Sequence, residues 1–157
     1  MKKAFVNRSG VLVLIGALWF GATTRAQYAG TEQSLNITVQ VLDGRNGKPL
    51  KNQHVLVFTG PSSDVVRTHA QHTGLVTDEA GIGTLMVNPS ETRWLQVFAD
   101  GSVPCNPNPN QGSFSVSEIM SNGLVTPNSC SFLVRAAPPG HLIVFARPAG
   151  FMEKMKQ

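Results

Sequence analysis

The chain has 157 residues, of which 41% are hydrophobic, 13 are basic and 9 are acidic. Four of the basic residues lie within the first 26, so residues 27–157 carry nine basic and nine acidic side chains. Because nucleic-acid binding depends on clustered cations that neutralise phosphates, this balance argues against a DNA- or RNA-binding protein.

The first 26 residues have the pattern of a secretory signal peptide. A basic start is followed by an apolar run at 11–20, and small residues lead to a cleavage point between Ala26 and Gln27. The run is about half as long as a membrane-spanning helix, so no stable span is expected after cleavage. These features predict an exported protein, periplasmic or extracellular, with a flexible extension at 27–34.

The residues at 35–149 are predicted to form one all-β domain. Residues 35–41 alternate apolar and polar side chains, which is the period of a half-buried strand. After turn residues at 43–47, the apolar residues 55–59 are expected to form its partner strand. Further strands, separated by turns rich in Gly, Pro and Asn, are predicted at 65–68, 75–77, 82–87 and 93–99. This pattern indicates an antiparallel β-sandwich.

Cys105 and Cys130 are the two cysteines of the chain, and in an oxidising compartment an isolated pair is expected to form a disulfide. The Pro- and Asn-rich stretch after Cys105 cannot form a regular element. Ser115 and Glu118 have the spacing of a capping box, which predicts a short helix that ends at Gly123. The segment 105–130 is therefore predicted to be a disulfide-closed insert beside the sandwich, with one helix inside it.

A last hairpin is predicted after the disulfide-closed loop. It joins residues 131–135 to residues 141–147 through a Pro-Pro-Gly turn. Residues 150–157 are expected to form a short helical tail with Phe151, Met152 and Met155 on one side. Docking of this tail on its own domain is favoured over covering a sheet edge or presenting anchors to a partner. The tail is too short and too weakly basic for stable membrane binding alone.

Residues 47–50 (Gly-Lys-Pro-Leu) follow the first strand and its turn, and residues 77–81 (Thr-Asp-Glu-Ala-Gly) lead into the strand at 82–87. In this order the two patterns resemble the transthyretin-like group, in particular the carboxypeptidase-regulatory-like β-sandwich of exported bacterial proteins. The resemblance spans residues 35–100. The chain departs from the family at 51–53, which replaces a small Gly-Ala pair, and at Gly83, where the family places an aromatic residue.

One enzyme of this architecture, hydroxyisourate hydrolase, has a catalytic histidine where this chain has Gln40. The enzyme also ends in a Tyr-Arg-Gly-Ser tail, which residues 153–157 do not match. Because a glutamine cannot serve as a general acid or base near neutral pH, the resemblance implies the fold without this activity. The expected function is a non-catalytic interaction or structural module, without a cofactor, that binds an unknown protein or glycan of the cell envelope.

Two regions are candidates for the binding surface. A loop held by a covalent bond has little entropy left to lose on binding, which favours the disulfide-closed segment. Trp94 and Phe98 share one face of a predicted strand and could stack on a sugar, although core packing is the commoner fate of such a pair. A carbohydrate- or cell-wall-binding module is therefore the first alternative. The candidate residues are Asn108, Gln111, Phe114, Glu118, Trp94 and Phe98.

His69 and His72 are the weak candidates for a metal site. Their spacing places both imidazoles on one side of a helix, whereas this segment is predicted to be strand or loop. A zinc site would need a third ligand, with His54 or His141 as possible donors. The favoured interpretation is a pair of surface polar residues, and a hydrolase with a histidine or metal site is the second alternative.

Overall fold

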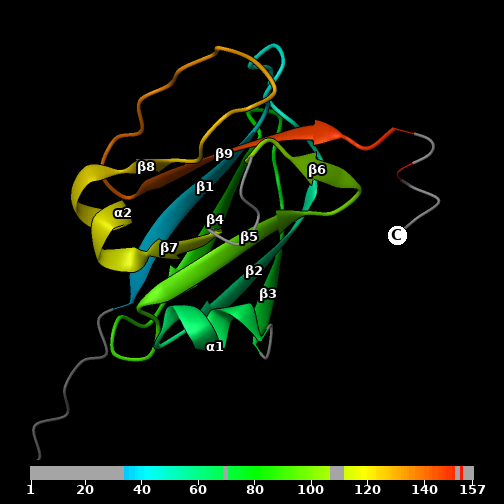
Figure 1. Cartoon of the computed structure of the whole chain (residues 1–157). Helices are drawn as coiled ribbons and strands as arrows, with labels where there is room; N and C mark the ends of the chain where they lie inside the picture. The colour runs from blue at the N-terminus through cyan, green and yellow to red at the C-terminus, as the bar shows by residue number, and fades with distance from the viewer. Residues whose placement is uncertain (1–33, 69–70, 107–111, 151–152, 154–157) are drawn as a thin grey trace, which may run out of the picture. The chain divides into compact units, whose positions relative to one another are not determined.

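The computed structural model describes residues 34–68, 71–106, 112–150 and Glu153. The strands in this part of the chain are β1 (Leu35–Asp43), β2 (His54–Gly60), β3 (His72–Val76), β4 (Ile82–Val87), β5 (Trp94–Ala99), β6 (Ser102–Pro104), β7 (Ser113–Ser115), β8 (Leu124–Val125) and β9 (His141–Pro148). One sheet has the order β4-β1-β9-β6, with β8 also paired to β9, and the other has the order β3-β2-β5-β7. The sheets form the two layers of a sandwich (Figure 1), so the predicted all-β sandwich is confirmed.

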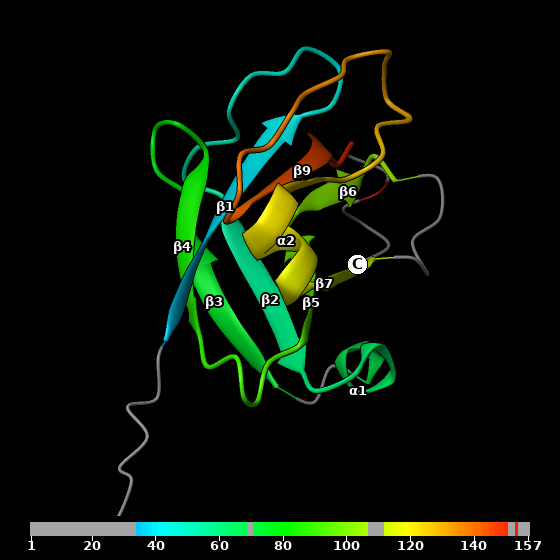
Figure 2. The ribbon, with the colours of Figure 1, turned by 90° about the vertical axis from the view of Figure 1, so that its left-hand side faces the viewer.

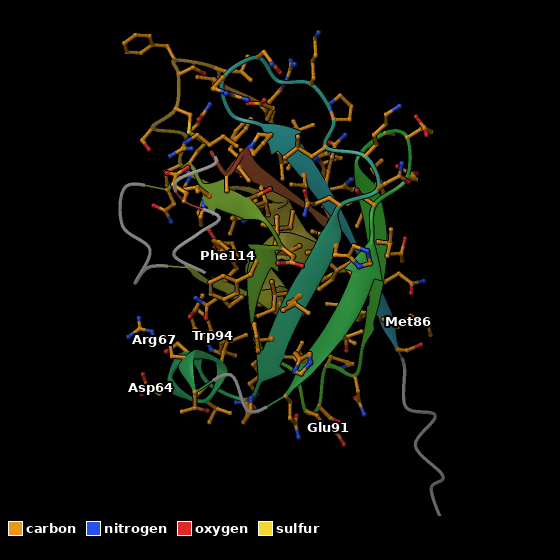
Figure 3. The ribbon with its side chains drawn as sticks, turned by 90° about the vertical axis from the view of Figure 1, so that its right-hand side faces the viewer. Asp64, Arg67, Met86, Glu91, Trp94 and Phe114 are labelled. Atoms are coloured by element: carbon orange, nitrogen blue, oxygen red, sulfur yellow. A yellow bond between two sulfur atoms is a disulfide. The ribbon has the colours of Figure 1, made fainter. Side chains whose placement is uncertain are left out.

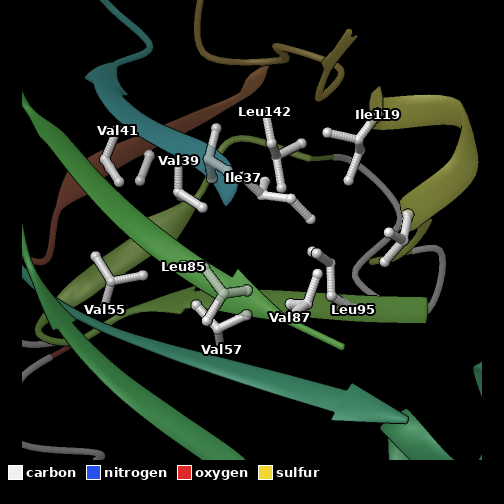
Figure 4. Close-up of a cluster of buried hydrophobic side chains, with 13 residues drawn as sticks. Ile37, Val39, Val41, Val55, Val57, Leu85, Val87, Leu95, Ile119 and Leu142 are labelled. Atoms are coloured by element: carbon white, nitrogen blue, oxygen red, sulfur yellow. The ribbon is translucent and has the colours of Figure 1, made fainter. Parts of the chain in front are cut away.

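The apolar alternation of the strands fills the space between the two sheets. In β1, Ile37, Val39 and Val41 are fully buried, while the residues between them face outward. Aliphatic side chains from β2, β4, β5 and β9 meet them there (Figure 4). Burial of this apolar surface is the main favourable contribution to folding. The main core consists of Ile37, Val39, Val41, Val55, Val57, Leu85, Val87, Leu95, Val116, Ile119, Leu142, Val144 and Ala146.

The strand β1 lies at the centre of the first sheet, between β4 and β9. It pairs antiparallel with β4, from Leu35 opposite Val87 to Gln40 opposite Ile82. It pairs parallel with β9, so the first sheet is mixed, whereas all pairs described in the second sheet are antiparallel. The strands predicted at 35–41, 82–87 and 93–99 are confirmed as β1, β4 and β5.

The prediction that 55–59 pairs with the first strand is wrong. β2 belongs to the second sheet, and both edges of β1 are occupied by β4 and β9. The connection folds back on β1 through a single bridge between Leu42 and Pro49, and then crosses to the other sheet. The buried Thr77 holds this crossing, because its hydroxyl donates to the Leu50 carbonyl (2.6 Å) and accepts from the Gln53 amide (2.9 Å).

The two patterns that resemble the transthyretin-like group lie against each other in the fold. Gly81 has a positive φ of +72°, and a Cβ there would lie 3.1 Å from Cβ of Pro49. Lys51 and Glu79 form a surface ion pair across the same contact (3.1 Å). The crossing loop and the β3–β4 turn therefore form one structural unit, although Gln53 and Thr77 are 24 positions apart in the sequence.

The segment at 65–68, predicted as a strand, is helical instead. The helix α1 spans Ser63–Arg67, and Ser62 caps it by accepting a hydrogen bond from the Val65 amide (3.3 Å). Its Val66 side chain is buried. The cap, the acidic residue in the first turn and this burial outweigh the strand preference of two successive valines.

The predicted hairpin at 131–147 is also wrong in its first half. Residues 141–148 form β9, but residues 131–135 form no strand. One edge of β9 is taken by β1, and the other is taken by β8 at Leu142 and Ile143 and by β6 at Ala146, Arg147 and Pro148. No edge of β9 is left for a hairpin partner, so the preceding segment runs over the outside of the sheet.

The predicted helix is confirmed as α2, which spans Val116–Asn122. Ser115 is its N-cap, with the side chain accepting from the Glu118 amide (3.4 Å), and Gly123 is its C-cap. Figure 2 shows α2 at the side of the sandwich between β1 and β7. Ile119 is fully buried in the main core, and β7 and β8 pair with β5 and β9. The disulfide-closed segment is thus an integral part of the sandwich and not an insert beside it.

Gly123 ends α2 with a φ of +71°, which residues with side chains rarely adopt. A Cβ at this position would also overlap the carbonyl oxygens of Ala137 and Pro138. We expect Gly123→Ala to lower the free energy of unfolding, measured by urea titration, by about 1–3 kcal/mol. Gly140→Ala is the matched control, because Gly140 has a similar φ of +79° with open space around it. Equal losses in the two variants would show that the overlap has no effect.

Candidate binding surfaces

The outer face of the first sheet carries a second, smaller apolar cluster. Leu42, Ile143 and Phe145 are buried on this face, opposite the main core. Cys105 is buried with them, and Leu133 and Ala137 pack against the cluster from the segment after β8. The segment between β8 and β9 therefore covers one side of the sheet as a third layer.

The predicted disulfide between Cys105 and Cys130 is confirmed, and it joins the residue that follows β6 to this covering segment. The backbone supports the same connection, because the Ser129 amide donates to the Cys105 carbonyl (2.7 Å) and the Cys105 amide donates to the Phe145 carbonyl (2.9 Å). Gly44 lies directly against this site, where a Cβ would come 2.5 Å from Sγ of Cys105. The crosslink is packed into the end of β1, so it constrains folded structure and not only a surface loop.

Two polar side chains hold the residues after Cys130 in place. The Asn128 amide group donates to the carbonyls of Gly44 (2.9 Å) and Leu133 (3.3 Å). The Ser131 hydroxyl donates to the Gly44 carbonyl (2.5 Å) and accepts from the Leu133 amide (3.1 Å). The backbone is therefore fixed on both sides of residue 132.

We call residues 130–135 the stapled tip. Its Leu133 points inward to the outer cluster, while the flanking Phe132 and Val134 point into solvent. Of the large apolar side chains that the structure describes, these two are the most exposed, at 104% and 84%. Single exposed apolar residues are common, but two neighbours presented by an ordered loop are typical of an interaction site.

Two cationic residues, Lys48 and Arg135, lie near the base of the stapled tip. Gly47 in the neighbouring turn lies against both Leu133 and Arg135, since a Cβ there would be 3.2 Å from Nη2 of Arg135. Lys48 and Arg135 are exposed, and no carboxylate of the described residues is within salt-bridge distance of either. Arg45 in the same turn is engaged by Asp43 (2.8 Å). The tip therefore combines an apolar pair with unpaired positive charge.

The Asp43 carboxylate organises the turn that adjoins the tip. It accepts hydrogen bonds from the Arg45 guanidinium (3.1 and 2.8 Å) and from the Arg45 backbone amide (2.9 Å). The guanidinium hydrogen bond is the main cause that lowers the pKa of Asp43 below its usual value of 3.8, against the opposing effect of burial. The folded state therefore favours the ionised carboxylate.

We expect this ion pair to make stability fall at acid pH. Because the pKa of Asp43 is lower in the folded protein, its contribution is present above the unfolded pKa and is lost as the pH falls through the folded pKa. Asp43→Asn should be less stable than the native chain at pH 7, and the difference should shrink at pH values below about 4. Urea unfolding of both proteins at several pH values measures this difference in stability. A difference that grows on acidification would contradict this assignment.

The second surface is the outer face of the sheet β3-β2-β5-β7, which Figure 3 shows from the front with Trp94 labelled. Leu95 and Val97 point into the main core, so Trp94, Gln96 and Phe98 point outward. Phe98 is edge-on to Phe58 (ring centroids 5.6 Å). The shared face predicted for Trp94 and Phe98 is therefore found, but on the side away from the main core, where both are half-buried.

Two polar atoms on this outer face lack a hydrogen-bond partner. Gln96 lies opposite Ser113 in the pairing of β5 with β7. Oε1 of Gln96 and Oγ of Ser113 are both buried and unpartnered. Because buried polar groups normally find a partner, this unpaired pair distinguishes the strand pairing of β5 with β7 from the other pairings of the sheet.

The other predicted binding residues do not form one site. Phe114 on β7 lies opposite Leu95 and packs against the main core, while Glu118 is exposed on α2. Asn108 and Gln111 lie outside the described residues. The exposure of the tip residues Phe132 and Val134 is not predicted from the sequence, because they belong to a short apolar run that is expected to form the first strand of the last hairpin.

The structure brings together no metal site in the residues it describes. His72 is exposed at the start of β3, and its ring lies 5.5 Å from that of Phe58. His69 falls outside the described residues. Within the described part of the chain, no three His, Cys, Asp or Glu side chains are grouped so that they could hold a metal ion.

Comparison of the chain with protein-family models, with curated proteins and with solved structures finds no match. In the ranges that the structure covers, no helix is long and apolar enough to span a membrane.

Proposed function

We propose that this protein is a non-catalytic interaction module of the cell envelope, exported by its first 26 residues, with a transthyretin-like sandwich as its scaffold. The scaffold proposal is supported by the contact between 47–53 and 77–81, the two segments that carry the resemblance. The export proposal is supported by the disulfide, because such bonds persist in oxidising compartments.

The observation that carries the interaction proposal is the stapled tip. Phe132 and Val134 are exposed, while the backbone around them is held by a disulfide and by Asn128 and Ser131. Such a loop has already lost its conformational entropy on folding, so binding costs it little further ordering. An ordered, exposed apolar pair is therefore suited to recognition.

The test measures how the protein is distributed between the envelope and soluble fractions of the cells that export it. After osmotic shock, we expect the native chain to be partly retained in the envelope fraction and the double variant Phe132→Ser/Val134→Ser to move into the soluble fraction. Met86→Ser is the matched control, because Met86 is 69% exposed on β4 and pairs with Asn36 near the start of β1, whereas the stapled tip lies beside the turn that follows the end of β1. Identical distributions of all three proteins would refute the proposed function.

A second candidate function is glycan binding on the outer face of the second sheet. It is favoured by the shared outward direction of Trp94 and Phe98, which are both half-buried on this face. Trp94 is the one tryptophan beyond the first 26 residues, so its fluorescence reports on this face alone after cleavage. Titration with cell-wall polysaccharides should change the emission, and a flat response to every polysaccharide would count against this candidate.

A further inference from the structure

We propose that the stapled tip binds the surface of an anionic lipid bilayer, with Phe132 and Val134 inserted among the acyl chains near the headgroups and Lys48 and Arg135 on lipid phosphates. This inference rests on the proposed function, because it names the partner of the same tip. The partner is a lipid surface, recognised by its negative charge and its apolar interior.

The shape of the tip favours a bilayer over a folded partner. Phe132 is more exposed than in an extended peptide, so it protrudes from the loop and does not line a groove. A protruding side chain needs a concave pocket on a protein partner, whereas a bilayer accepts it without a preformed shape. Phe132 and Val134 are two residues apart, with Leu133 directed inward between them, so both enter from the same side.

The positive charge at the tip complements the negative charge of an anionic lipid surface. Arg135 follows the apolar pair directly, and Lys48 lies in the turn packed against Leu133 and Arg135. The Asp43 carboxylate in this turn is already engaged by Arg45, which limits its repulsion of phosphates. Apolar residues flanked by Lys and Arg are the side chains that hold proteins at a membrane interface.

The ordered backbone of the tip influences the strength of its association with a membrane. The disulfide and the hydrogen bonds of Asn128 and Ser131 hold the tip in its exposed form before contact. Insertion of two side chains with two cations produces weak, reversible and salt-sensitive association, far from the permanence of a spanning helix. Such binding concentrates an exported domain near a membrane and allows it to leave.

The experiment uses protein recovered from the periplasm of an expressing cell after mass spectrometry has shown that it starts at Gln27. It is sedimented with vesicles of phosphatidylcholine alone, or with about 30% phosphatidylglycerol added, at about 50 mM and about 500 mM salt. We expect binding to the anionic vesicles only, and loss of this binding at high salt.

The variants assign the binding to the tip. Phe132→Ala should lower the partition coefficient by about tenfold. Arg135→Gln should lower it by about fivefold. Met86→Ala should leave it unchanged, because Met86 is also a large apolar side chain, 69% exposed, but lies on β4.

Absence of binding to either vesicle, or equal binding by the native chain and Phe132→Ala, would overturn the lipid proposal. If the native chain does not bind the vesicles while the Phe132→Ser/Val134→Ser variant still leaves the envelope fraction, the tip binds a protein or glycan of the envelope and the proposed function stands. If both experiments fail, the tip is not an interaction surface.

Discussion

Replacing Cys105 and Cys130 with serine is expected to lower the free energy of unfolding by about 3–4 kcal/mol. The disulfide closes a loop with a sequence separation of 25, so its loss returns that entropy to the unfolded chain. The loss should also weaken the outer cluster, because Cys105 is buried there among Leu42, Ile143 and Phe145. Urea unfolding of the native chain with and without reductant, beside the double serine variant, measures this effect.

The double alanine variant, Cys105→Ala/Cys130→Ala, is the control for side-chain chemistry. It removes the crosslink without placing a hydroxyl group in the apolar site at Cys105, so it should be at least as stable as the double serine variant. A native protein whose unfolding midpoint does not change with reductant would contradict the structural role given to this bond. That result would also remove the basis for an ordered stapled tip.

Ile119→Ala is expected to lower the free energy of unfolding by about 2–5 kcal/mol. Ile119 is fully buried in the main core, although it lies within the disulfide-closed segment. Truncation leaves a cavity between α2 and the two sheets, and the well-packed neighbours cannot close it completely. A loss of this size would show that the segment 105–130 is part of the fold.

Ser121→Ala on the same helix is the matched control. Ser121 is exposed, and its hydroxyl donates to the carbonyls of Ser117 and Glu118 within α2. Its replacement should change stability by less than about 0.5 kcal/mol, because alanine is the better helix former. If Ile119→Ala and Ser121→Ala unfold at the same urea concentration, α2 does not belong to the cooperative core.

The two candidate surfaces show which structural features could not be predicted from sequence patterns. Trp94 and Phe98 could be assigned to one face from their spacing, but the face they share became known only from the packing of Leu95 and Val97 on the main core. Phe132, Leu133 and Val134 form a short apolar run that is compatible with a strand, but a strand also needs a partner edge. β9 has none to offer at that side, because β8 and β6 already occupy it.

The local patterns determined the elements whose energetics are local. The alternation in β1, β4 and β5, the cap at Ser115 and the cysteine pair were all predictable, because each depends on neighbours in the chain or on the one available partner. The tertiary structure alone decided which strands pair, which side of each sheet is inner, and that residues 131–135 cover a sheet as an exposed loop. Those choices depend on competition between distant segments for the same strand edges and the same apolar faces, and no window of sequence contains both competitors.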